Sequence, residues 1–411
     1  MSGKEGPVAP PHRLGNRFDA YLMPLCCNPC ISGLLLTLKW RDYMAIMVNY
    51  VPHNTQVEAP RASAAQILPR EYPPLRRKKP LFAGIDLGTN NCRMLVGTPH
   101  GTGFQVLDSF SRVVRLGEGL YETGNLSEVA MQRAIASLAI CADRVRRWSM
   151  EPDYSRLAIR AIATEACRQA ENGAQFIARA RRETGLPLEI IFPREEAELA
   201  VESCTSLIAG AGRRAQLFDI GGGSTEIAWV RVNAEGVPPD LIGFVSLPIG
   251  VVTLSERCAD ACFTEAGFSS VVRDVGLLLR PFEEVHRIGQ EIRQGGVRMI
   301  GTSGTVTTLA GVSLKLDRYR RGVIDGAALS REAVDEALTE ARSLGREGLG
   351  RHPCIGLDRV DFVLPGCAIF AAIHELWQAP ELVVADRGLR EGMLMRLMRA
   401  EKPPFRRAAA P

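Results

Sequence analysis

Short apolar runs alternate with amphipathic stretches from residue 81 to about residue 400. Six of these runs are bounded by glycine or polar residues and have the length of a buried strand. The predicted strands are 81–86, 92–97, 156–164, 188–192, 215–220 and 226–230. Apolar residues at helical spacing predict helices over 131–148, 193–204, 331–345 and 381–400. Because strands alternate with helices, the sequence predicts an α/β fold.

One hairpin pattern occurs twice. The segments DLGTNNCRMLV and DIGGGSTEIAW align so that Asp86 matches Asp219 and Arg93 matches Glu226. Each copy has the pattern of a strand, a glycine turn and a second strand. A repeated element of this kind predicts two similar α/β halves.

Several helices have a residue that can cap the first turn. Ser127 precedes the helix over 131–148, and Thr164 follows a predicted strand and precedes another helix. A third glycine turn, GTSGT, differs from the hairpins because a helix follows it. There Ser303 or Thr305 is predicted to cap, so that free N–H groups point outward.

The first 80 residues differ from the rest of the chain. They are rich in proline, lack sustained periodicity, and hold 11 Lys/Arg against 5 Asp/Glu, which leaves 39 against 41 for residues 81–411. We interpret residues 1–80 as a disordered N-terminal extension. The CxxC of Cys27 and Cys30 has no second pair at zinc-finger spacing, which favours incidental thiols. Since the rest is nearly neutral, an anionic ligand must be held by local sites.

Composition narrows the class of protein further. The chain has 11 scattered cysteines, which indicates a reducing, cytoplasmic environment. It has no run of about 18 apolar residues, so we expect no membrane span. Its 4 tryptophans show no stacking pattern with basic residues, so we expect no nucleic-acid partner. The sequence is compatible with a homodimer but carries no sign of one.

The glycine turns point to phosphate chemistry. A tight turn of glycines can aim several backbone N–H groups at one anion, since no side chain blocks the approach. Ser224 and Thr225 add hydroxyl donors. The aspartates before the turns suit a phosphate site only if a hard cation such as Mg²⁺ lies between. No turn ends in GK[ST], which excludes a Walker P-loop, and a single DxGGG turn is also compatible with a plain tight hairpin.

The ordered set of motifs resembles a known family. GIDLGTNNCRMLV, VVRLGEGLYETGNLS, AIATEACRQAENG, EIIFPREEAELA, FDIGGGSTEIAWV, GTSGTVTTLAG and GLREGML are similar, in this order, to the exopolyphosphatase and guanosine pentaphosphate phosphatase (Ppx/GppA) family. That family belongs to the actin, sugar-kinase and Hsp70 superfamily. The resemblance implies two ribonuclease-H-like (actin-like ATPase) domains facing a cleft. It gives domain I over 81–203, domain II over 204–400 and a tail over 401–411.

The resemblance also implies roles for individual residues. Glu196, the second glutamate of PREEA, matches the catalytic glutamate, while Glu195 and Glu198 remain structural. Asp86, Asp219 and Glu226 are similar to the metal-binding carboxylates. The residues that match phosphate ligands are Gly88, Thr89, Asn90, Arg93, Arg168, Gly221, Gly222, Gly223, Ser224, Thr225 and Gly304. Glu165 adds a negative charge beside Arg168, and DRGLRE at 386–391 is interpreted as packing and ion pairing.

The leading expectation is a Mg²⁺-dependent hydrolase that removes the terminal phosphate of inorganic polyphosphate. Guanosine pentaphosphate is the alternative substrate, since both reactions cleave a phosphoanhydride. An ATP-binding actin-like or kinase-like protein is a second class that the hairpins alone allow. A sensor that binds polyphosphate or a nucleotide without cleaving it is a third.

Overall fold

The computed structural model describes residues 78–101, 103–234 and 237–401, which all belong to one compact unit, Pro74–Pro411. Nearly all of the predicted extension and of the predicted tail lies outside these residues, as does the CxxC of Cys27 and Cys30.

The first sheet has the strand order β3-β2-β1-β4-β5. Its strands are β1 (Lys79–Leu87), β2 (Asn91–His100), β3 (Gly103–Val113), β4 (Tyr154–Ala163) and β5 (Leu188–Ile190). Strand β1 pairs antiparallel with β2 and parallel with β4. The connecting helices are α1 (Leu120–Thr123), α2 (Glu128–Ser149), α3 (Glu165–Gln169) and α4 (Gly173–Thr184). The sheet is therefore mixed, and a hairpin lies at its centre.

The second sheet has the order β10-β11-β9-β6-β7-β8. Its strands are β6 (Arg214–Ile220), β7 (Thr225–Arg231), β8 (Asp240–Leu247), β9 (Val297–Thr302), β10 (Ala328–Ser330) and β11 (Glu381–Ala385). Strand β6 pairs antiparallel with β7 and parallel with β9, as β1 does with β2 and β4. The central pairings of the two sheets are thus alike, which confirms the predicted repeat.

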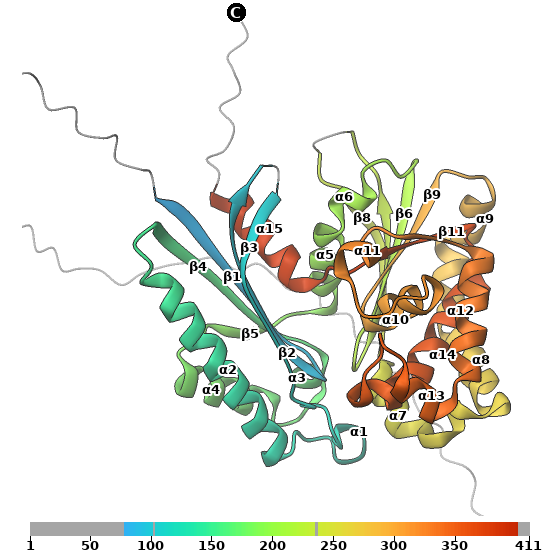
Figure 1. Cartoon of the computed structure of the whole chain (residues 1–411), viewed down its shortest axis with the longest axis horizontal. Helices are drawn as coiled ribbons and strands as arrows, with labels where there is room; N and C mark the ends of the chain where they lie inside the picture. Colours follow the sequence, from blue (N-terminus) through green and yellow to red (C-terminus); the bar gives the residue numbers. More distant parts are fainter. Residues whose placement is uncertain (1–77, 102, 235–236, 402–411) are drawn as a thin grey trace, which may run out of the picture. The chain divides into compact units, whose positions relative to one another are not determined.

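Both faces of each sheet are packed, and two helices lie between the sheets. Along β1, Ile85 packs in the core with α2, whereas Phe82 packs against Leu394 of α15 (Leu389–Glu401). Along β6, Phe218 packs in the outer core of the second sheet, whereas Leu217 packs with α5 (Pro193–Ser203) and α15. Since period-2 alternation sends neighbours to opposite faces, each sheet is covered on both sides. Helices α5 and α15 form the shared layer (Figure 1).

The remaining helices surround the second sheet. They are α6 (Thr205–Ile208), α7 (Val251–Cys258), η1 (Ala259–Phe263), α8 (Glu265–His286), α9 (Ile288–Arg293), α10 (Gly304–Ser313), α11 (Arg321–Ile324), α12 (Arg331–Ser343), α13 (Gly345–Arg351), η2 (Leu357–Arg359) and α14 (Val360–Trp377). The segment Leu357–Trp377 is long and apolar enough to cross a membrane, but 78% of its apolar window is buried. It is therefore the central core helix of the second half.

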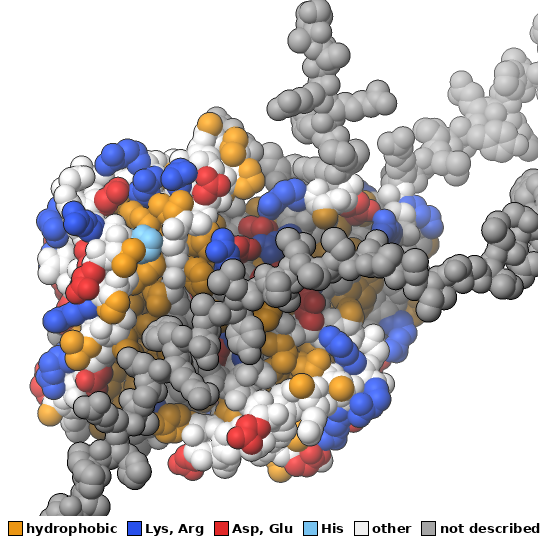
Figure 2. Space-filling view, turned by 180° about the vertical axis from the view of Figure 1, so that it is seen from behind, with side chains coloured by type: hydrophobic (Ala, Val, Ile, Leu, Met, Phe, Trp, Pro, Cys, Tyr) orange, Lys and Arg blue, Asp and Glu red, His pale blue; other side chains and the backbone are white. Residues whose placement is uncertain are grey.

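The surface of the described part carries charges of both signs. In Figure 2, side chains of both charge signs lie mainly around the edge of the described surface, and hydrophobic side chains gather toward its middle. This mixture agrees with the near-neutral balance of residues 81–411. It supports the expectation that an anionic ligand is held by a local site rather than by a broad field.

The structure confirms most predicted elements and contradicts three details. Ser127 caps α2 as predicted, since its Oγ accepts from the N–H of Ala130 at 3.2 Å. Thr164 occupies the N-cap of α3, but its side chain makes no capping hydrogen bond. Residues 381–385 form β11 rather than the start of a helix, because a five-residue apolar run carries no decisive period. The third detail is the N-cap of α10, where Ser303 makes no capping hydrogen bond.

Candidate active site

Two hairpin turns face each other at one end of the sheets. Cross-strand pairing places Asp86 opposite Arg93 in the first turn and Asp219 opposite Glu226 in the second. The turns close alike, because Gly88 N–H donates to Asn91 C=O and Gly221 N–H donates to Ser224 C=O, each at 2.9 Å. The register inferred from the sequence repeat is confirmed.

The glycines of the second turn are explained by its contact with the first. A Cβ added to Gly223 would lie 2.6 Å from Thr89 Oγ1, and one added to Gly222 would lie 3.1 Å from Thr89 Cβ. Any larger residue would therefore push the turns apart. Within the described part of the chain, the N–H groups of Thr89, Asn90, Gly222 and Gly223 donate to no other residue. They remain available to an anion between the turns.

Gly250 and the start of α7, which the sequence analysis did not single out, pack against the carbonyl side of the second turn. Val251 N–H donates to Gly221 C=O at 2.9 Å, and Val252 N–H donates to Gly222 C=O at 2.8 Å. A Cβ on Gly250 would lie 2.4 Å from the carbonyl carbon and oxygen of Gly222. The start of α7 thus fixes the carbonyl side of the turn, and only glycine fits at position 250.

The third glycine turn is strained at Ser303. Its φ of 96° and ψ of 172° lie in a region that non-glycine residues rarely adopt. In this conformation Ser303 makes no capping bond to α10, so the predicted cap at Ser303 is wrong, and Thr305 lies inside the helix instead. The Ser303 hydroxyl is buried and makes no hydrogen bond to a described residue. Gly304 lines the same cleft as the two hairpin turns.

Glu196 lies at the start of α5, as predicted, and it lines the cleft. Its side chain is 10% exposed, and its Oε2 accepts from Arg168 Nη1 at 2.8 Å. Burial raises the pKa of the Glu196 carboxyl well above its usual value; the carboxylate of Glu226 adds to this, and Arg168 opposes it. Glu195 points elsewhere, since its Oε1 binds Arg160 at 2.7 Å and Arg396 at 3.0 Å.

Three carboxylates accompany the turns, of which Asp86 and Glu226 are buried and Asp219 is partly buried. Asp86 is 8% exposed and its Oδ1 has no hydrogen bond to a described residue. Burial raises the pKa of Asp86 above its usual value and raises that of Asp219 to about 6. Burial likewise raises the pKa of Glu226 to about 7, although Ser246 Oγ donates to its Oε1 at 2.8 Å. Asp86 and Asp219 line the cleft, whereas Glu226 does not.

The donor set fits Mg²⁺ only together with a ligand. No group of three His, Cys, Asp or Glu side chains in the described residues is placed to hold a metal ion by itself. Mg²⁺ is commonly held by one or two carboxylates, water and substrate phosphates. The orphaned Asp86 Oδ1 and the Asp219 carboxylate supply such a pair, with Glu226 behind them.

Comparison with known proteins identifies the family of the chain. The model of the Ppx/GppA phosphatase family matches residues 96–401, more than half of the chain. The chain belongs to the Ppx/GppA phosphatase family. It is similar to the crystal structure of an exopolyphosphatase-like protein, with 26% identity and a TM-score of 0.68 over 79% of this chain and 99% of that one. The family member from Aquifex aeolicus gives 25% identity and a TM-score of 0.64 over the same shares.

A further solved structure agrees in fold. An exopolyphosphatase from Cytophaga hutchinsonii is 21% identical, with a TM-score of 0.67 over 78% of this chain and 98% of that one. These comparisons confirm the resemblance and the actin-like α/β fold. The chain is thus a Ppx/GppA-type phosphatase, and the candidate site described above lines a cleft of about 610 Å³.

The two arginines predicted as phosphate ligands differ in their surroundings. Arg168 is held by carboxylates, since it donates to Glu165 Oε2 at 2.6 Å and to Glu196 Oε2 at 2.8 Å, and it does not line the cleft. Arg93 lines the cleft and makes no ion pair with a described residue. The structure therefore places Arg168 as a holder of Glu196 and leaves Arg93 facing the ligand space.

Sequence reasoning missed Arg359, which donates to Gly304 C=O at 2.6 Å and to Thr308 Oγ1 at 2.9 Å. It lines the cleft and has no carboxylate partner among the described residues. Burial lowers the pKa of Arg359. No local motif marks this arginine, and only the fold brings it to the third glycine turn.

DRGLRE at 386–391 is mostly an ion-pair segment, as interpreted. Arg387 binds Asp325 at 3.0 Å, and Glu391 accepts from Arg321 at 2.9 Å. Arg390 differs, because it lines the cleft.

Most of the predicted site residues line the cleft, namely Asp86, Gly88, Thr89, Asn90, Arg93, Glu196, Asp219, Gly221, Gly222, Gly223, Ser224 and Gly304. Thr225 lies behind them, and its hydroxyl donates to Ile249 C=O at 2.6 Å.

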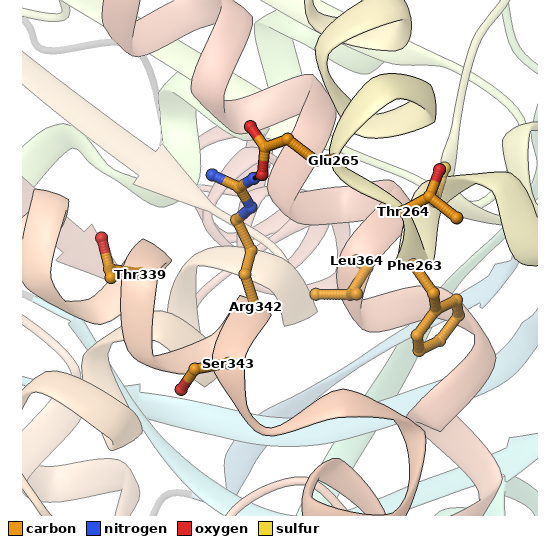
Figure 3. A pocket seen from close by; sticks show the side chains of 8 residues that line it. Phe263, Thr264, Glu265, Thr339, Arg342, Ser343 and Leu364 are labelled. Atoms are coloured by element: carbon orange, nitrogen blue, oxygen red, sulfur yellow. Dashed lines mark hydrogen bonds and ion pairs between the residues drawn. The ribbon is translucent and has the colours of Figure 1, made fainter.

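A smaller pocket of about 300 Å³ lies away from this cleft, between η1, α12 and α14 (Figure 3). Its charged residues, Arg342 and Glu265, bind each other, and Arg342 also packs over the Phe268 ring at 4.3 Å. Since the two charged residues of this pocket bind each other, the cleft with its unpaired Asp86 Oδ1 remains the candidate active site.

Proposed function

We propose that this phosphatase is a Mg²⁺-dependent exopolyphosphatase that hydrolyses the terminal phosphoanhydride of inorganic polyphosphate. The observation that carries the proposal is the convergence of three features on one cleft. Free N–H groups of two glycine turns, the pair Asp86 and Asp219, and the buried base Glu196 all line it. The free thiols of the described cysteines fit the cytosolic location that we propose with it.

In this proposal the glycine turns hold the terminal phosphate. The N–H groups of Thr89, Asn90, Gly222 and Gly223 donate to its oxygens, and Ser224 supplies a hydroxyl. Because these donors are fixed by the fold, they stabilise the charge that spreads over the oxygens in the transition state. Mg²⁺ held by Asp86 and Asp219 would neutralise part of the phosphate charge.

Glu196 acts as the general base. It orients a water molecule toward the terminal phosphorus and accepts the proton that the water loses. Arg168 fixes one carboxylate oxygen, Oε2, while no described residue donates to Oε1. The raised pKa makes this carboxylate a stronger base than an exposed glutamate. Glu196 is thereby held in one orientation with one oxygen free for the water.

Guanosine pentaphosphate is the second candidate substrate. It presents a triphosphate end whose terminal bond is chemically the same, so the same turns and base would serve. The proposal favours inorganic polyphosphate, because the similar solved proteins include an exopolyphosphatase-like protein.

The test is phosphate release by the purified protein with Mg²⁺. Long-chain polyphosphate, guanosine pentaphosphate and ATP are compared at equal concentrations of terminal phosphate. We expect the highest kcat/KM with polyphosphate. A higher kcat/KM with guanosine pentaphosphate would move the role to that substrate, and binding without release from any of the three would favour the sensor hypothesis.

A further inference from the structure

Glu165 is a buried carboxylate of the cleft that the proposed reaction does not use. It begins α3, it is 7% exposed, and it lines the cleft beside the second glycine turn. A Cβ added to Gly223 would lie 3.1 Å from Glu165 Cγ, so the glutamate side chain packs against that turn. A buried carboxylate is costly unless it is paired, and its partners therefore indicate its role.

Both oxygens of Glu165 are bound by neighbouring side chains. Its Oε2 accepts from Arg168 Nη2 at 2.6 Å and from Arg168 Nε at 3.0 Å. Its Oε1 accepts from Gln169 Nε2 at 2.8 Å. The protein itself thus satisfies this carboxylate, which favours a role toward Arg168 over a contact with metal or substrate.

Arg168 is held from two sides. Its Nη1 donates to Glu196 Oε2 and to Ile191 C=O, each at 2.8 Å. These two contacts share one nitrogen, so they alone would leave the guanidinium plane free to turn about it. Glu165 binds the other edge, Nε and Nη2, and thereby fixes the plane.

The orientation of Glu196 depends on that plane. Arg168 is the one ion-pair partner of Glu196 within the described part of the chain. If the guanidinium turned, Glu196 Oε2 would follow it, and Oε1 would leave the position from which it orients water. A misplacement of about 1 Å in a reacting group can cost about 10²-fold in rate. Glu165 is thus linked to the base through a single arginine.

We propose that Glu165 is a positioning residue that acts on the reaction through Arg168. It holds Arg168 against the base Glu196 and outside the ligand space, which Arg168 does not line. The inference rests on the proposed function and deepens it, because it gives a carboxylate of the cleft the task of orienting the base rather than holding metal or substrate.

The test is a double-mutant cycle in kcat between Glu165 and Arg168. Glu165→Met keeps an unbranched side chain against Gly223 but removes both acceptor oxygens, and it is combined with Arg168→Met. Phosphate release from polyphosphate with Mg²⁺ is measured at a temperature at which thermal unfolding shows each variant to be folded. The matched control is Glu171→Met, because Glu171 is exposed, lies just after α3 and does not line the cleft.

We expect Glu165→Met to lower kcat by at least about tenfold and to change KM by less than about threefold, since Glu165 does not touch the substrate. Glu165→Gln keeps one acceptor for Arg168, so its kcat should fall by less than about threefold. In the Arg168→Met background, Glu165→Met should have almost no further effect, because the residue through which it acts is gone. Glu171→Met should leave kcat and KM unchanged.

An equal loss of kcat from Glu165→Met with and without Arg168 would overturn the proposal, as would a folded Glu165→Met protein with normal kcat. A rise in KM or in the Mg²⁺ requirement as large as the loss of kcat would also overturn it, since Glu165 would then bind a ligand. If Arg168→Met does not fold, Arg168→Gln replaces it in the cycle, and Glu165→Ala replaces Glu165→Met in the same way.

Failure of the proposed function is a separate outcome of the same assay. A wild-type protein that releases phosphate from guanosine pentaphosphate or ATP but not from polyphosphate contradicts the proposed function, and the cycle is then measured with the substrate that is cleaved. A wild-type protein that cleaves none of the three would overturn both proposals.

Discussion

Gly250→Ala tests whether the active site depends on the support of the second glycine turn. A Cβ at this position would lie 2.4 Å from the carbonyl carbon and oxygen of Gly222 and 2.6 Å from the carbonyl oxygen of Gly221. Ordinary contacts begin at 3.4 Å, so the turn must move by about 1 Å. The clash is with backbone, which has no rotamer to relieve it.

Two consequences have different magnitudes. Overpacking of this kind costs about 1–3 kcal/mol of stability, so the protein should remain folded. A displacement of about 1 Å in groups that position a substrate can cost about 10²-fold in rate. We therefore expect kcat/KM for phosphate release to fall by about 10²-fold while the unfolding temperature falls by a few degrees.

The assay compares phosphate release and thermal unfolding with those of Gly276→Ala. Gly276 lies within α8, and no heavy atom would come within 4 Å of an added Cβ. We expect this control to keep full activity and to gain about 0.5–1 kcal/mol, because alanine favours a helix over glycine. A Gly250→Ala protein with full activity would refute the reasoning, since the turn would then tolerate displacement.

Three further predictions concern the buried charges. Arg168→Met leaves the Glu196 carboxylate without its partner, so the free energy of unfolding should fall by about 3–5 kcal/mol. The control Arg146→Met breaks an exposed ion pair with Asp143 and should lower the free energy of unfolding by less than about 1 kcal/mol. Burial raises the pKa of Glu226 to about 7, so the native state keeps a proton that the unfolded chain has lost, and stability should fall as pH rises from about 4.5 to about 7. Glu226→Gln should flatten that decline by up to about 3 kcal/mol in denaturant titrations at pH 5 and pH 8, and an unchanged slope would contradict the burial argument. Chelation of Mg²⁺ should abolish phosphate release, and activity that survives chelation would exclude the metal from the mechanism.

The elements that the sequence predicts well are those fixed by neighbouring residues. The paired hairpins follow from an aspartate, a glycine turn and two apolar runs, all within about a dozen positions. Helix α5 follows from Pro193 and its acidic first turn, and α2 follows from Ser127. Because these signals lie in neighbouring residues, the elements can be predicted without knowledge of the fold.

The missed features depend on residues far apart in the chain. Arg359 lies 266 positions after Arg93 (359 minus 93), and only the stacking of the two halves brings both to one cleft. Gly250 matters because a different turn approaches it closely. The strain at Ser303 is likewise set by its surroundings, which override its local tendency to cap a helix. Long-range contacts of this kind leave no periodic pattern.

The central claim is that Glu196 is the base of a hydrolase, and a matched pair of variants tests it most directly. Phosphate release from long-chain polyphosphate is measured for Glu196→Gln and for Glu198→Gln, which lies on the same helix and binds Arg194 at 3.0 Å. The account predicts a loss of at least about 10²-fold in turnover for Glu196→Gln, with tripolyphosphate binding retained, and normal turnover for Glu198→Gln. Normal turnover by a folded Glu196→Gln protein would contradict the account.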